Sequence, residues 1–150
     1  MTRDEIKFLK HCLQNYNYYW KHYLELLDIR DELSAERLAL ATNTTSVMKK
    51  PVKDQTPFDL YSSSKWKTIV AMQEDCEKEI TFFWWAIQYT DKMLNDISDY
   101  EVQTMLKELY IQEIPRGEVR RNHFIADDKA MYRIIRSRLK KHKVRRPMKM

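Results

Sequence analysis

The sequence predicts an all-α protein, built as a long antiparallel helical hairpin followed by a C-terminal helix-turn-helix domain. Its 150 residues include one glycine and 4 prolines among many Lys, Glu, Leu and Met residues, a composition typical of helices. Apolar residues also recur at steps of three and four over long stretches, as they do on the buried face of a helix. We therefore predict a hairpin region over residues 1–97, which contains a flexible linker at 42–64, and a second domain over residues 98–150.

Charge is distributed unevenly along the chain. Residues 116–150 contain 13 Lys+Arg and 3 Asp+Glu, a net charge of +10, whereas the other residues contain 14 and 19, a net charge of −5. Such a dense basic segment attracts nucleic acid by releasing counterions, whatever the base sequence. A solvated tail or a helix on a membrane surface would show the same charge, but no leucine-rich or aromatic stripe accompanies the basic residues after Leu139.

The first long helix is expected from Asp4 to about Ala41. Its apolar residues follow a heptad pattern that predicts a coiled-coil contact, formed by Ile6, Leu9, Leu13, Tyr16, Trp20, Tyr23 and Leu27. The aromatic residues Tyr16, Tyr18, Tyr19, Trp20 and Tyr23 have two interpretations. They would either stack on the bases of a single strand or pack in a core or interface with their hydroxyls at its edge. We favour packing.

Residues 42–64 have the composition of a linker, rich in Thr, Ser and Asn and interrupted by Pro51 and Pro57. The second long helix is expected to begin at Ser63 or Ser64 and to end near Ile97, with two apolar stripes. Two stripes imply two packing partners: the first helix, packed antiparallel, and either the C-terminal helices or a second subunit. We favour a homo-oligomer, a dimer or higher, over one monomeric core. The predicted oligomer interface consists of Trp20, Tyr23, Leu27, Phe82, Trp85 and Tyr89.

Three helices are predicted beyond residue 97. The first begins with a capping box between Ser98 and Glu101 and ends at Pro115, which cannot continue a helix. Gly117, the only glycine, follows this break, where we expect the backbone to need a glycine's freedom. Residues 118–122 form a short helix with Val119 facing inward, and residues 123–126 form the turn.

The third of these helices is capped by Asp127 or Asp128. Its inner stripe is apolar and consists of Ala130, Met131, Ile134, Ile135 and Leu139. The opposite side is basic, the division that a recognition helix needs to pack on its own domain while it enters a major groove. The predicted base-reading residues are Asp128, Lys129, Tyr132 and Arg133. The predicted phosphate contacts are Arg116, Arg120, Arg121, Arg136, Lys140 and Lys141.

Four short runs carry a resemblance to a known family: residues 109–111 (LYI), 117–119 (GEV), 125–130 (IADDKA) and 136–139 (RSRL). They resemble the region-four-like helix-turn-helix of sigma factors. The whole chain is similar in plan to the phage late-transcription regulators of the ArpU and RinA type. That resemblance implies an activator that binds promoter DNA upstream of a late phage operon, with RNA polymerase as a further candidate partner.

No residue pattern indicates catalysis, so we predict a non-enzyme that uses neither a cofactor nor a metal. The four histidines lack ligand spacing, one glycine cannot build a phosphate loop, and Cys12 and Cys76 are expected to be reduced, buried thiols. No apolar run is long enough to span a membrane and the first residues lack a signal-peptide core, so we expect a cytoplasmic location in a bacterial host cell. The alternative functions are a phage protein-interaction module or inhibitor, which binds a host protein through its aromatic helices, and a sequence-neutral single-strand or RNA binder.

Overall fold

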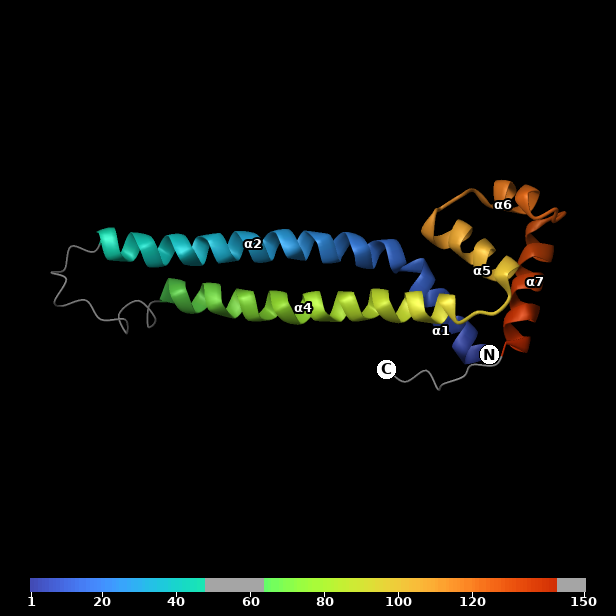
Figure 1. Ribbon diagram of the computed structural model, residues 1–150, viewed down its shortest axis with the longest axis horizontal. Helices are drawn as coiled ribbons and strands as arrows, with labels where there is room; N and C mark the ends of the chain where they lie inside the picture. The colour runs from blue at the N-terminus through green and yellow to red at the C-terminus, as the bar shows by residue number, and fades with distance from the viewer. Residues whose placement is uncertain (48–63, 143–150) are drawn as a thin grey trace. The chain divides into compact units, whose positions relative to one another are not determined.

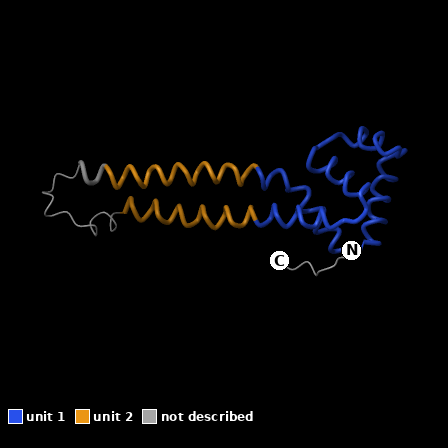
Figure 2. Tube along the Cα trace, in the orientation of Figure 1, with its two compact units in different colours: residues 1–20, 85–150 blue, residues 21–84 orange. Residues whose placement is uncertain are grey.

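The computed structural model describes residues 1–47 and 64–142, in which every regular element is a helix (Figure 1). The predicted all-α fold class is therefore confirmed for this part of the chain. The chain divides into two compact units (Figure 2): unit 1 combines Met1–Trp20 with the residues from Trp85 onward, and unit 2 is Lys21–Trp84. This division differs from the predicted boundary at residue 97, because the first twenty residues pack with the C-terminal helices.

The predicted first helix is divided at Asn15 into α1 (Arg3–Gln14) and α2 (Tyr16–Val47). A capping box begins α1, since the Thr2 hydroxyl accepts from the Glu5 backbone N–H at 3.2 Å and the Glu5 carboxylate accepts from the Thr2 N–H at 3.4 Å. At the other end, the Asn15 side-chain amide donates to the His11 carbonyl at 2.8 Å. The side chain of Asn15 thus satisfies a terminal carbonyl at the break, which periodicity alone does not reveal.

Residues 42–47 continue α2 as helix, so the linker begins later than we expected, and residues 48–63 lie outside the described part of the chain. The next described element, α4 (Ser64–Asn95), begins where the sequence predicted and ends two residues early.

In unit 2, the described parts of α2 and α4 run antiparallel (Figure 1). The ring of Tyr23 lies 5.3 Å from that of Trp84, while further along the pair the Arg37 guanidinium lies 4.8 Å above the Trp66 ring. Between these contacts is a small core of buried side chains: Leu26, Leu33, Cys76 and Ile80. The antiparallel packing of unit 2 therefore rests on apolar burial with aromatic contacts toward its ends.

Unit 1 contains the larger core. It is assembled from α1, the end of α4, α5 (Tyr100–Leu106), α6 (Arg116–Asn122) and α7 (Asp128–Lys141). Seven side chains of this core are only 0–1% exposed: Leu9, Leu13, Leu94, Val102, Met105, Val119 and Met131. Met131 and Val119 are both on the inward side that the sequence predicted for them.

The approach to α6 corrects three expectations. Asp99, not Ser98, caps α5, because its carboxylate accepts from the Val102 N–H at 3.2 Å. The helix then widens into the π-helical segment Lys107–Ile111, and the Asn17 side-chain amide donates to the carbonyl of Ile111 at 3.0 Å. Pro115 stands at the N-cap of α6, so the preceding helix ends at Ile111 and not at Pro115, and α6 begins at Arg116, two residues before the predicted start.

Gly117 lies inside α6 and has no positive φ, so the predicted need for a glycine there is wrong. The left-handed conformations in the described chain occur at Glu113 (φ 53°) and at Phe124 (φ 58°), on either side of α6. Phe124 is in the turn between α6 and α7, and its side chain is 97% exposed. A bulky residue in this backbone region is strained by its own Cβ.

We expect Phe124→Gly to raise the free energy of unfolding by about 0.5–1 kcal/mol, because glycine removes the Cβ strain while the exposed ring contributes no burial. Urea unfolding measures the change. Phe124→Ala is the matched control, since it removes the ring and keeps the strained Cβ, and it should leave stability near wild type. Equal stabilisation by both variants would show that the ring, and not the backbone, is the source of the strain.

Candidate nucleic-acid interface

The N-terminus of α7 is fixed by two neighbouring aspartates. Asp127, one of the two caps that the sequence predicted, caps the helix by accepting from the Ala130 N–H at 2.7 Å. Asp128 forms an ion pair with Arg120 of α6 at 2.8 Å and lies 3.9 Å from Arg116. The Arg120 guanidinium also donates to the Ala126 carbonyl at 3.0 Å. This pair therefore ties α6 and the turn to the first residues of α7.

Three predicted DNA contacts are affected by this arrangement. Asp128, predicted to read a base, and Arg120, predicted to hold a phosphate, are engaged with each other. Arg116 remains mostly exposed, and a hydrogen bond with Tyr132, followed by the nearby Asp128, raises its pKa above the usual range. The sequence pattern could not show this pairing, because the distance between α6 and α7 depends on how the turn folds.

The outer side of α7 forms a shallow basic groove of about 670 Å³. It brings together six of the predicted contact residues with Ser137, and its lining is Lys129, Tyr132, Arg133, Arg136, Ser137, Lys140 and Lys141. No acidic residue lines it, and its Lys and Arg side chains are exposed. On the opposite side of the same helix, Met131, Ile135 and Leu139 are buried. The structure thus places the cations and the core residues on separate sides of α7.

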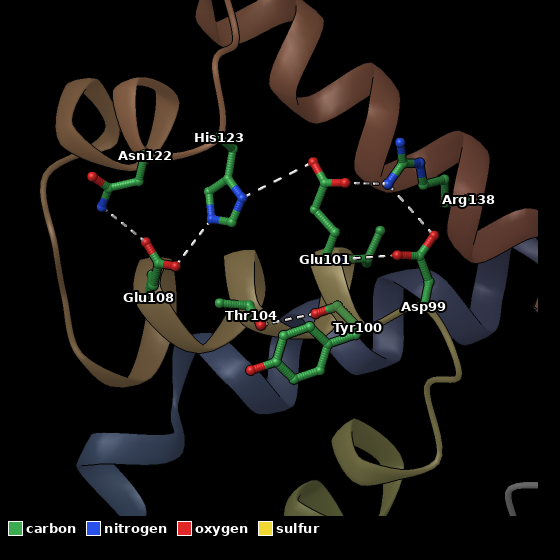
Figure 3. Close-up of polar contacts among 9 residues, drawn as sticks. Asp99, Tyr100, Glu101, Thr104, Glu108, Asn122, His123 and Arg138 are labelled. Carbon is green, nitrogen blue, oxygen red and sulfur yellow. Dashed lines mark hydrogen bonds and ion pairs between the residues drawn. The ribbon is translucent and has the colours of Figure 1, made fainter.

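A polar network beneath the turn holds the helices in place (Figure 3). The His123 ring lies 3.0 Å from Glu108 and 4.0 Å from Glu101, and both His123 and Glu108 are almost buried at 13% and 12% exposure. The Asn122 amide donates to the other oxygen of Glu108 at 3.4 Å. Residues from the end of α6 therefore bind directly to the helix that precedes it.

Arg138 extends this network onto α7. Its guanidinium donates to Glu101 at 3.0 Å and lies 3.6 Å from Asp99. The bond with Glu101 raises the pKa of Arg138 above its usual range. Sequence reasoning missed this role for Glu108 and His123. A signal for Glu108 was present, because its carboxylate lies next to Leu109 on a helix face that is otherwise apolar.

The basic surface also includes α1, which the sequence analysis did not assign to binding. A second groove, of about 480 Å³, is lined by α1, α7 and the helix between Leu106 and Tyr110. Its charged residues are Arg3, Lys7 and Lys10 from α1 and Arg136 and Lys140 from α7. Their spacing along α1 indicates one helix side, but only the fold shows that this side lies beside α7.

Within each unit, the aromatic residues predicted at an oligomer interface differ in environment. In unit 2, Tyr23 contacts Trp84 and Leu27 packs against the small core, whereas Phe82 is 52% exposed. In unit 1, the Trp85 and Tyr89 rings stack with centroids 4.9 Å apart, and Trp20 is half-buried.

The tyrosines of the aromatic cluster also differ in their burial and contacts. Tyr16 is buried, its hydroxyl donates to Asp91 at 2.7 Å, and burial raises its pKa. Tyr23 packs against Trp84. For these two residues, packing is therefore the correct interpretation. Tyr18 remains 52% exposed beside Tyr19.

Cys12 and Cys76 are free and buried, as predicted, and burial raises the pKa of both thiols. Within residues 1–47 and 64–142, no three His, Cys, Asp or Glu side chains gather as a metal site would require. In the same residues, no helix combines the length and the apolar character needed to cross a bilayer.

Comparisons with protein-family models, with curated proteins and with solved structures gave no significant match for this chain. The resemblance to regulators of the ArpU and RinA type therefore stays a prediction, which rests on the four short runs quoted above.

Proposed function

We propose that this chain is a sequence-specific DNA-binding transcriptional regulator, in which α6, the turn and α7 act as a helix-turn-helix. The observation that carries the proposal is the division of α7 into a buried apolar side and an exposed basic side without acids. A recognition helix needs this division, because one side anchors it while the other meets base edges and phosphates. The 14 residues of α7 give a rod about 20 Å long.

The groove residues divide by their position along α7. Lys129, Tyr132 and Arg133 lie in the first two turns and are proposed to reach base edges, with Arg133 suited to a bidentate contact with guanine. Arg136, Lys140 and Lys141 lie further along and are proposed to hold phosphates. Arg116 and Arg121 of α6 are exposed and are proposed as further phosphate contacts. Asp128 and Arg120 position the helix instead.

The biological setting follows from the resemblance alone. It suggests an activator of late genes in a phage or prophage, acting at a promoter in the bacterial cytoplasm, with RNA polymerase as a second partner. The basic groove supports DNA binding in this role, and repressors as well as activators use such a surface.

Selection of duplexes from a random library, followed by sequencing, tests the proposal. Wild-type protein should enrich a defined motif, and Arg133→Ala should lose preference at one base position at a cost of about 1–3 kcal/mol. Arg121→Ala should weaken binding to every sequence alike. If no motif is enriched, or if single strands compete as well as duplexes, the chain is not a sequence-specific duplex reader. A stable host-protein complex without a DNA motif would instead favour the interaction-module function.

We also propose that the chain self-associates through the exposed aromatic surface at Phe82. Phe82→Glu should raise the dimer dissociation constant at least tenfold, because it removes an aromatic side chain of the kind whose loss at a hot spot costs about 2 kcal/mol or more, and it places an unpaired charge in the contact. Analytical ultracentrifugation measures the constant, and Thr81→Glu, on an exposed neighbour, is the matched control. A wild-type chain that stays monomeric at the highest concentration reached would contradict the proposal.

A further inference from the structure

The groove between α1 and α7 differs in chemistry from the basic groove on the outer side of α7. The apolar side chains of its lining, which we call its base, include Ile6, Leu13, Leu106, Tyr110 and Leu139. Of these, Leu13, Leu106 and Leu139 are buried. Five cationic side chains line it and no acidic residue does. Its volume of about 480 Å³ lies within the range of about 300–1,000 Å³ that is usual for small-molecule sites.

A duplex does not complement such a groove. Phosphates and sugars can pair with its cations, but they offer no apolar surface to cover the base of the groove. A ligand that matches both parts has a hydrocarbon portion for the base and an anionic group for the cations. Arg3 and Arg136 each present a planar guanidinium, which pairs with a carboxylate through two parallel hydrogen bonds.

We propose that this groove binds a free linear aliphatic carboxylate, with the tail along the apolar base and the carboxylate among the cations. The length of the groove sets the length of the tail. Its lining on α1 extends from Arg3 to Leu13, which is about 15 Å of helix. A saturated chain advances roughly 1.25 Å per carbon–carbon bond, so a chain of ten carbons, with nine bonds and a length of roughly 11 Å, fits within this groove.

Binding in this groove should be coupled to the proposed DNA contacts. Arg136 and Lys140 line both this groove and the basic groove of α7. A carboxylate that engages them removes two cations proposed to hold phosphates, so ligand and duplex compete. This coupling rests on the proposed function, whereas the binding of the carboxylate does not.

Calorimetric titration of the full chain with decanoate, below its micelle-forming concentration, tests the site. Decanoate should bind with a stoichiometry of one, and both acetate, which lacks the tail, and decanol, which lacks the charge, should bind at least tenfold more weakly. The double variant Lys7→Gln, Lys10→Gln should weaken decanoate binding at least tenfold. The matched control Lys65→Gln, Lys67→Gln, on exposed lysines of unit 2, should leave it unchanged.

Several results would overturn the proposal. Equal binding of decanol would show that the cations play no part, and a stoichiometry well above one would show surface adsorption. Binding to vesicles of anionic lipid without binding to monomeric decanoate would assign the surface to a membrane. A second variant, Ile6→Glu, places a carboxylate in the groove and should abolish binding, with circular dichroism confirming that the helices are intact.

A duplex titration with and without decanoate separates the two proposals. Decanoate should weaken duplex binding by wild-type protein and have no effect on the Lys7→Gln, Lys10→Gln variant at the same concentration. If decanoate binds but no duplex does, the ligand site stands and the proposed function fails. If the duplex binds but decanoate does not, the proposed function stands and the ligand site fails.

Discussion

Replacing Arg133, Arg136 and Lys140 together by glutamine is expected to lower duplex affinity by roughly two orders of magnitude at moderate salt. All three side chains line the basic groove of α7, where no acidic residue offsets them. Each phosphate contact that is lost should reduce the slope of log affinity against log salt by about 0.9. Loss of Arg136 and Lys140 should therefore reduce the slope by roughly 1.8, and loss of Arg133 should also remove the preference at one base position.

Fluorescence anisotropy at several salt concentrations gives both the affinity and the slope. The matched control is Lys65→Gln, Lys67→Gln, Lys78→Gln, which removes the same charge from exposed positions of unit 2. It should retain most of the wild-type slope. If the control loses as much affinity as the α7 variant, net charge and not the face of α7 governs binding.

His123→Ala is expected to lower the free energy of unfolding by about 1–3 kcal/mol. The substitution leaves the nearly buried Glu108 carboxylate with only the Asn122 amide, 3.4 Å away, as a donor among its described contacts. A charge that loses its partner away from water keeps its desolvation cost without compensation. The loss should therefore exceed that of an ordinary surface substitution, although His123 contributes little apolar surface to the core.

A double-mutant cycle with Glu108→Gln identifies the source of the loss. In the His123→Ala background, Glu108→Gln should restore part of the stability, because a neutral amide costs less to bury than a carboxylate. Urea unfolding of the four proteins provides the coupling energy. Strictly additive losses would show that His123 and Glu108 do not interact as their 3.0 Å separation indicates.

Local features of the fold could be predicted from the sequence. The cap at Asp127 and the buried stripe of Met131, Ile135 and Leu139 follow from residues within a few turns of one another, where helix periodicity is decisive. The short helix α6 with Val119 buried could be predicted for the same reason.

Features that depend on distant residues could not be predicted in this way. The pairing of Arg120 with Asp128 depends on the fold of the turn, and the π-helical segment coincides with a hydrogen bond from Asn17, far away in the sequence. The prediction for Gly117 failed because glycine's freedom was assumed at a place where Pro115 already begins the helix. The groove between α1 and α7 was missed because periodicity does not say which helix lies alongside α1.

Unit 1 combines the first and the last described helices, and this affects how the chain folds during its synthesis on the ribosome. Leu9 and Leu139 share one core but are 130 positions apart, and all of unit 2 is made between them. At about 5–20 residues per second, the first helix emerges roughly 6–26 s before the last one that covers it. Unit 2 can bury its own small core in that interval, whereas the apolar side of α1 stays exposed until α7 has been synthesised.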